Sequence, residues 1–273
     1  MTALRFEKVS FAYGRHPALA EVSFSLAAGE RVALLGRNGA GKTTLTRLVT
    51  GLLHPRSGVV LVGDWETAGR RPEQLARRVG SVFQHADQQL FARTVREDVG
   101  FGPRALGQSA SESARRVEAA LAALELGDVA DQHPYDLPAP YRKLAALAGA
   151  LALEPMLLVL DEPTAGLDRA LKARVARAIA ARAEAGVAVL VVTHDLAFAA
   201  ETLDRGLVLE RGRLAEDQPL ARLLTSAERL GALGLAPPPV AALSAALRLP
   251  GTPIREADAA RALARVAGGH PAV

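Results

Sequence analysis

The chain has 273 residues, of which 49% are hydrophobic and 23% charged, a balance that predicts a globular protein with one large domain and a small appendage. It contains no cysteine, which excludes disulfides, thiolate metal sites and cysteine nucleophiles. A formal charge of +4 is more typical of a solvated surface than of a nucleic-acid-binding one. Residues 1–7 carry charge where a signal peptide needs an apolar stretch, and no uncharged apolar run approaches the roughly 20 residues that cross a bilayer. We therefore expect any membrane role to depend on a partner.

Apolar alternation in the first 83 residues predicts strands, with one glycine-rich turn among them. In chain order we expect strands near Leu4–Phe11, Val22–Leu26 and Arg31–Leu35, a helix from Lys42 to about Thr50, and strands at Val59–Val62 and Val79–Phe83 separated by a polar helical stretch.

Strand signals vanish between about residues 85 and 150, where helical spacing appears at Ser111–Leu124 and Tyr141–Leu153. The alternating pattern then resumes. It predicts a strand at Leu157–Leu160, a helix at Arg169–Glu184, a strand at Val187–Val192, a short helix and a hairpin at Leu207–Leu214. This order predicts an α/β fold with a mostly parallel sheet, an antiparallel edge and a helical subdomain over residues 85–150. Residues 221–273, rich in Ala and Leu, predict a small helical extension.

A phosphate-binding loop follows the strand at Arg31–Leu35. Its pattern is complete and lies between a predicted strand and a predicted helix, so a glycine-rich turn with a chance lysine is the weaker reading. In such a loop backbone N–H groups surround the phosphates, Lys42 reaches the β- and γ-phosphates, and the hydroxyl of Thr43 ligates Mg²⁺. The expected ATP-binding residues of this P-loop NTPase fold are Gly36, Arg37, Asn38, Gly39, Ala40, Gly41, Lys42, Thr43 and Thr44.

Two adjacent carboxylates, Asp161 and Glu162, follow the apolar strand Leu157–Leu160. The carboxyl ends of parallel strands are where ligands bind in open α/β sheets. We expect Asp161 to hold Mg²⁺ and Glu162 to polarise the attacking water in phosphoryl transfer. An acidic pair alone is common, but its pairing with a phosphate loop is specific.

These motifs, in this order over roughly residues 4–220, resemble those of the ATP-binding-cassette (ABC) ATPases. The resemblance implies four further roles. Tyr13 resembles the aromatic that stacks on adenine, and Gln84 the glutamine that touches Mg²⁺ and water and relays to the membrane subunit. His194 resembles the histidine that contacts the γ-phosphate, and residues 165–168 the loop that crosses the ATPase dimer interface.

A narrower resemblance lies in residues 83–91, with 94–99 and 101–103. These stretches are similar to the ATPases of energy-coupling-factor importers, which take up vitamins or transition-metal ions. The tail Leu235–Leu247 resembles the C-terminal extension that helps two such ATPases pair. The resemblance implies a transmembrane coupling protein, a substrate-binding membrane protein and a second ATPase as partners, at the cytoplasmic face of the cell membrane.

One segment departs from the family pattern. Where the family has Leu-Ser-Gly-Gly-Gln before a helix, this chain has Leu137-Pro138-Ala139-Pro140-Tyr141. Pro138 supplies neither a hydroxyl nor an N–H, and Pro140 removes a second N–H, although proline is compatible with the first turn of a helix. We therefore expect the helix to form and its γ-phosphate contact to be weakened, which favours a partner with an intact signature.

Two other functions remain open. A cassette of this superfamily could act on nucleic acid or ribosomes, but the chain has one cassette, no coiled-coil insertion and no basic, aromatic-interleaved patch. A regulatory cassette that binds ATP with little turnover would be consistent with the altered signature. We expect an ABC ATPase domain over residues 1–220 and no nucleic-acid partner.

Overall fold

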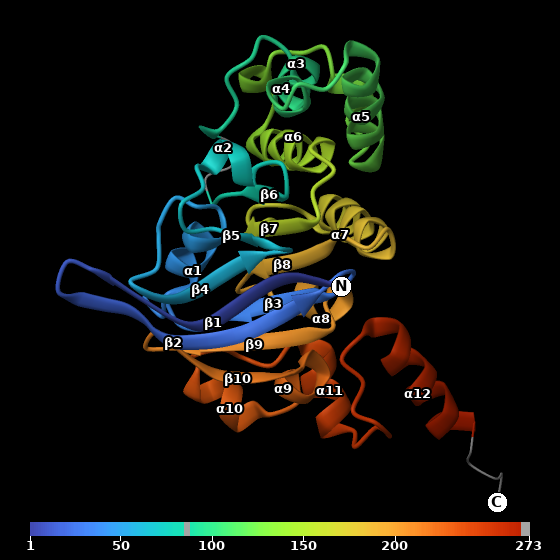
Figure 1. The fold of residues 1–273 in the computed structure, drawn as a ribbon. Helices are drawn as coiled ribbons and strands as arrows, with labels where there is room; N and C mark the ends of the chain where they lie inside the picture. The colour runs from blue at the N-terminus through green and yellow to red at the C-terminus, as the bar shows by residue number, and fades with distance from the viewer. Residues whose placement is uncertain (85–87, 269–273) are drawn as a thin grey trace, which may run out of the picture.

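The computed structural model describes residues 1–84 and 88–268, and Figure 1 shows how their helices and strands are arranged. Among these residues, six strands form a central sheet in the order β10-β9-β3-β8-β7-β6. Their bounds are β3 (Arg31–Leu35), β6 (Val79–Val82), β7 (Leu157–Asp161), β8 (Ala188–Val192), β9 (Arg205–Glu210) and β10 (Arg213–Pro219). Strands β6, β7, β8, β3 and β9 are parallel, and β10 pairs antiparallel with β9. The predicted mostly parallel sheet with an antiparallel edge is confirmed.

Apolar residues cover both faces of the central sheet. Successive side chains of a strand point to opposite faces, so each parallel strand contributes to both hydrophobic clusters. In β3, Ala33 and Leu35 belong to one hydrophobic cluster, whereas Val32 and Leu34 belong to the other. Continuous apolar runs such as Leu157–Leu160 follow from this two-sided burial.

A second, antiparallel sheet has the strand order β2-β1-β4-β5. It consists of β1 (Thr2–Tyr13), β2 (His16–Ala27), β4 (Ser57–Val62) and β5 (Trp65–Glu66). Buried Leu4 and Phe6 of this sheet share a cluster with Leu34 of the central sheet and Leu45 of α1 (Lys42–Val49). The sequence pattern predicted β1, β2 and β4, but neither the short β5 nor the separate sheet that these strands form.

Helices α3–α6 lie together at one end of the molecule (Figure 1). Their bounds are α3 (Val95–Val99), α4 (Phe101–Ala105), α5 (Ala110–Ala123) and α6 (Ala139–Ala152), with 3₁₀ turns at Gly127–Val129 and Pro134–Asp136. Helices α5 and α6 match the two helices predicted here within two residues, whereas α3 and α4 were not predicted individually. Residues 85–87, where the predicted subdomain begins, lie outside the described residues.

The remaining helices connect the strands or follow the last one. They are α2 (Pro72–Leu75), α7 (Arg169–Glu184), α8 (Leu196–Thr202), α9 (Leu220–Leu224), α10 (Ala227–Ala232), α11 (Pro239–Ala246) and α12 (Glu256–Gly268). The polar helical stretch expected before Val79 is reduced to the single turn of α2. Helices α9–α12 lie at the end opposite α3–α6 (Figure 1). Buried Leu223, Leu230 and Ala241 place α9–α11 in one hydrophobic cluster with the central sheet, and Arg255, directly before α12, donates to the carboxylate of Asp204 at 2.8 Å. Within the described residues, none of these helices has the length and apolar character needed to cross a membrane.

Candidate active site

Four segments carrying predicted site residues leave the same edge of the central sheet. The glycine-rich loop follows β3, Asp161 ends β7 and Glu162 follows it, His194 follows β8, and Gln84 follows β6. Because these strands are parallel, their carboxyl ends meet at one edge. Together with Tyr13 of β1 these segments line a cleft of about 840 Å³. The predicted residues that line it are Tyr13, Asn38, Gly39, Gly41, Lys42, Thr43, Thr44, Gln84, Asp161, Glu162 and His194.

The glycine-rich loop has a backbone that side chains would disturb. Gly36 has a φ of 144° and Gly39 a φ of 79°, values that L-residues rarely adopt. A Cβ on Gly36 would also lie 2.3 Å from the carbonyl oxygen of Leu209 in β9. Gly41 precedes α1 without a side-chain cap, and no acidic residue occupies the first turn. The N–H groups at this helix terminus are therefore available to an anion.

Lys42 supplies a cation inside the loop. Its buried ammonium donates to the carbonyl oxygens of Gly36 at 2.7 Å and Arg37 at 3.0 Å. Burial lowers the pKa of Lys42, while the carboxylates of Glu162 and Asp161 act in the opposite direction. An ammonium held by two neutral carbonyls can move to a stronger acceptor such as a phosphate.

Asp161 and Glu162 are close together and poorly solvated. Burial raises the pKa of Asp161, and the neighbouring negative charge of Glu162 adds to the shift. Oε2 of Glu162 accepts from the hydroxyl of Thr193 at 3.4 Å, whereas Oε1 is buried and has no hydrogen-bond partner among the described residues. Nε2 of His194 lies 3.7 Å from that same Oε1. A buried carboxylate oxygen without a partner fits a site built to receive a polar atom that is not part of the chain.

Tyr13 and Gln84 contribute an aromatic ring and an amide to the cleft. The ring of Tyr13 is 43% exposed, and its hydroxyl lies 3.4 Å from Oγ1 of Thr44 at the start of α1. Phe11 packs edge-on against it at 5.0 Å. The face of an exposed and supported ring is suitable for stacking on a base. Gln84 is exposed on the β6 side.

The oxygen donors in the cleft match the chemistry of Mg²⁺. Thr43, Gln84 and Asp161 provide a hydroxyl, an amide carbonyl and a carboxylate, and Mg²⁺ in nucleotide sites is held by one or two such side chains plus phosphate oxygens and water. Among the described residues, no cluster of three or more His, Cys, Asp or Glu side chains could hold a metal ion. The oxygen donors of Thr43, Gln84 and Asp161 fit a metal ion whose other ligands are phosphate oxygens and water.

Some predicted loop residues do not line this cleft, and some residues that do were not predicted. Gly36 faces β9, and Arg37 and Ala40 line a neighbouring cleft of about 930 Å³ that reaches Ala232 of α10. Conversely, Ala18 of β2 lines the cleft, and Thr193 hydrogen-bonds Glu162. Of these two residues, only Thr193 could have been suspected from the sequence, because it directly precedes the predicted site residue His194.

The altered signature forms the start of α6, as expected. Pro138 occupies the position before the helix in an extended conformation, and Pro140 lies in its first turn. The backbone N–H groups of Tyr141 and Arg142 both donate to the carbonyl of Pro138, and the guanidinium of Arg142 donates to the carbonyl of Leu137 at 3.1 Å. The helix therefore begins without a serine hydroxyl or glycine amides at its terminus.

Comparisons with known proteins agree with this geometry. Residues 19–165 match the family described as ABC transporter. A cobalt import ATP-binding protein from Rhodobacter capsulatus is 42% identical over 238 residues, which are 86% of this chain and 85% of that protein. An energy-coupling factor transporter ATP-binding protein from Symbiobacterium thermophilum is 39% identical over 234 residues, 85% of this chain and 81% of that protein. The solved structure of CbiO1 from Clostridium perfringens has a TM-score of 0.76 at 28% identity, covering 91% of this chain and 99% of its own.

The fold and the cleft define a P-loop ATPase cassette. The chain belongs to the ABC transporter family, among the ATP-binding subunits of energy-coupling-factor importers. Its activity is ATP hydrolysis coupled to transport. The family resemblance read from the sequence is therefore confirmed.

Proposed function

We propose that the chain binds Mg²⁺-ATP in the cleft and hydrolyses it with Glu162 as the group that orients and deprotonates water. Lys42 and the loop amides neutralise the β- and γ-phosphates, Tyr13 stacks on adenine, and His194 contacts the γ-phosphate. Thr43, Gln84 and Asp161 would hold the metal ion, which supplies positive charge to the phosphate oxygens. The observation that best supports this assignment is the buried Oε1 of Glu162 beside Asp161, which has no hydrogen-bond partner among the described residues.

The test of this role is Glu162→Gln in the complex that co-purifies with the tagged chain. The amide keeps the size of the side chain but cannot accept the proton. We expect turnover to fall by about 10²-fold or more while ATP affinity is kept. Near-normal turnover of the variant would show that Glu162 is not the base.

We further propose that a membrane partner docks beside Gln84. The rings of Phe91 and Phe101 are 65% and 51% exposed and pack edge-on at 4.9 Å. The carboxylate of Asp98 accepts from the N–H groups of Phe91 and Ala92 at 2.7 and 2.8 Å and so fixes the aromatic pair. Exposed aromatic side chains in a fixed position are typical anchors of protein interfaces. Through this surface, the binding or loss of the γ-phosphate near Gln84 would change the position of the membrane subunit.

The relatives suggest the context of this docking. Their names refer to import and to an energy-coupling factor transporter, which supports membrane-embedded partners. We propose that the chain lies peripherally at the cytoplasmic face of the cell membrane, with a transmembrane coupling protein and a substrate-binding membrane protein as partners. The name of the Rhodobacter relative refers to cobalt import, so a transition-metal ion, or a vitamin as in other importers of this type, is the class of solute. Solute specificity would reside in the membrane chains.

The altered signature supports pairing with a different ATPase. In a homodimer, Pro138 and Pro140 would face both nucleotides, and each γ-phosphate would lack its serine and amide donors. Loss of one preorganised donor costs on the order of 3 kcal/mol at a reacting centre, so loss of several would nearly silence a site. A partner with an intact signature would complete the site built on Lys42 and Glu162 and leave its own site silent.

Residues 221–273 are proposed to be a separate extension that strengthens this pairing, beyond an ATPase domain of residues 1–220. Leu243 of α11, Leu247 directly after it, and Leu263 and Val266 of α12 are exposed, which leaves apolar surface for a second subunit. Leu243→Ser combined with Leu263→Ser changes only exposed positions, so this variant should retain ATP binding but pair less tightly, as measured by sedimentation of the complex.

A further inference from the structure

Lys143 connects the helical end of the molecule to the catalytic edge of the sheet. It lies in the second turn of α6, and its ammonium donates to the carbonyl oxygen of Ala165 at 2.6 Å and to that of Glu162 at 3.4 Å. Both acceptors belong to the turn that follows β7, about 20 residues away in the sequence. An ammonium group with three donors can bind two carbonyls at once.

The turn that Lys143 holds has a strained start. Glu162 has a φ of 50°, a left-handed conformation that non-glycine residues seldom adopt and that persists only when surrounding contacts fix it. The N–H of Glu162 donates to the carbonyl of Val192 in β8 at 2.8 Å. Its carbonyl accepts from the N–H of Ala165 at 3.3 Å and from Lys143. The backbone of Glu162 is thus held on both sides, and Lys143 is the contribution from α6.

We propose that Lys143 is a positioning residue for hydrolysis, an inference that rests on the proposed catalytic role of Glu162. The φ of a residue sets the direction of its Cα–Cβ bond, so relaxation of Glu162 to an ordinary negative φ would turn its carboxylate away from the cleft. Lys143 opposes that relaxation. Ala165 also begins the loop of residues 165–168, so the same contact links α6 to the segment expected at the dimer interface.

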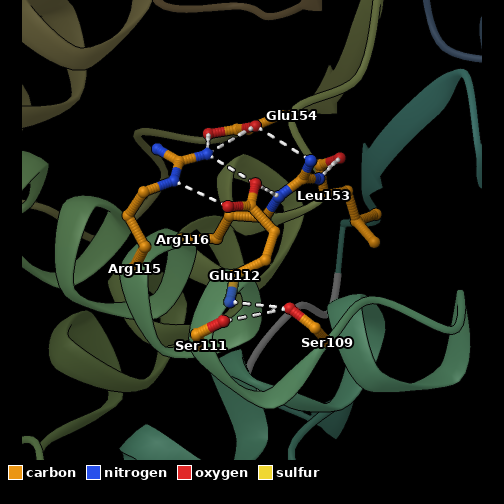
Figure 2. Close-up of polar contacts among 7 residues, drawn as sticks. All are labelled: Ser109, Ser111, Glu112, Arg115, Arg116, Leu153 and Glu154. Carbon is orange, nitrogen blue, oxygen red and sulfur yellow. Dashed lines mark hydrogen bonds and ion pairs between the residues drawn. The ribbon is translucent and has the colours of Figure 1, made fainter.

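At the C-terminal end of α6, Arg116 of α5 makes a comparable contact with a backbone carbonyl (Figure 2). The guanidinium of Arg116 donates to the carbonyl of Leu153 at 3.1 Å and to the carboxylate of Glu112 at 2.7 Å. Arg116 also pairs with Glu154 at 3.2 Å, and Arg115 bonds the same two carboxylates. None of these residues lines the cleft of the described chain. Arg116→Met is therefore a matched control, because it removes a cation from a carbonyl at the end of α6 remote from Glu162.

The experiment compares Lys143→Met, Lys143→Arg and Arg116→Met in the complex isolated through a tag on this chain, with ATP turnover, the KM for ATP and Tm measured for each. We expect Lys143→Met to lower kcat about 10- to 100-fold with KM within about twofold, since a small misplacement of a catalytic group affects the transition state and not ground-state binding. Lys143→Arg should recover kcat to within about threefold, because the guanidinium can donate to both carbonyls. Arg116→Met should lower Tm and leave kcat within about twofold.

Two results would overturn the inference: a wild-type kcat in Lys143→Met, or an equal loss of kcat in Lys143→Met and Arg116→Met. If Lys143→Met does not fold, Lys143→Gln takes its place, since its neutral amide keeps two of the three donors on a shorter side chain and should give an intermediate kcat. A wild-type kcat in Lys143→Gln would count against the inference. Glu162→Gln in the same assay separates the two proposals. Turnover retained by Glu162→Gln would reject the catalytic role of Glu162, whereas turnover lost in Glu162→Gln and kept in Lys143→Met would reject only the positioning role.

Discussion

The backbone of the phosphate loop predicts a sharp difference between two glycine-to-alanine changes. At Gly36, φ is 144° and an added Cβ would lie 2.3 Å from the carbonyl oxygen of Leu209. Since carbon and oxygen atoms without a bond stay more than 3 Å apart, the loop or β9 must move by about 1 Å. At Gly39, φ is 79° but no atom lies within 4 Å of the added Cβ. Gly39→Ala therefore isolates the conformational strain, and Gly36→Ala adds a backbone clash.

The strain of a left-handed alanine costs about 1–2 kcal/mol, and an overpacked contact adds about 1–3 kcal/mol. For a chain of this size, 1 kcal/mol corresponds to roughly 2 °C in Tm. We expect Gly39→Ala to lower Tm by about 2–4 °C and Gly36→Ala by about 4–10 °C. Thermal unfolding followed by circular dichroism, with ATP titrated onto each folded variant, measures both effects. Equal Tm values for the two variants would refute the clash, and with it the described packing of the loop against β9.

Three further changes test the contact with the base, the docking surface and the altered signature. Tyr13→Ala should weaken ATP and GTP binding alike by about 1–3 kcal/mol, because stacking recognises the face of a base; unchanged affinities by calorimetry would exclude stacking. Phe91→Ala should uncouple solute uptake from a preserved basal turnover, and normal uptake in reconstituted vesicles would place docking elsewhere. The triple change Pro138→Ser, Ala139→Gly and Pro140→Gly should raise turnover of the native complex by restoring the missing donors, and an unaltered rate would contradict an asymmetric pair.

Local patterns predicted which residues would lie around one cleft, as well as the fold class, but not how the strands divide between two sheets. The strand before the glycine-rich loop and the strand before Asp161 are short apolar runs, and parallel strands bring their carboxyl ends to one edge. Because the strands before Lys42, Asp161 and His194 were expected to be parallel, these three residues were expected to lie at one edge of the sheet. The structure places all three around one cleft.

Features that depend on long-range packing were not visible in the sequence. Alternation at Leu4 and Phe6 marks a buried face but does not say which sheet covers it, so the separate antiparallel sheet was missed. The contact of Lys143 with the carbonyl of Ala165 spans 22 positions and involves a backbone atom, which leaves no mark on residue types. Helix α3 is five residues long, too short for a helical period to be recognised.

The most direct test of the central claim is a structure of this chain with a non-hydrolysable ATP analogue and Mg²⁺. We expect the triphosphate in the loop of residues 36–43 with Lys42 on the terminal phosphates, adenine on Tyr13, and the metal ion beside Thr43 and Asp161. A nucleotide in the neighbouring cleft beside Arg37 and Ala232, or a triphosphate that Lys42 does not contact, would contradict this expectation.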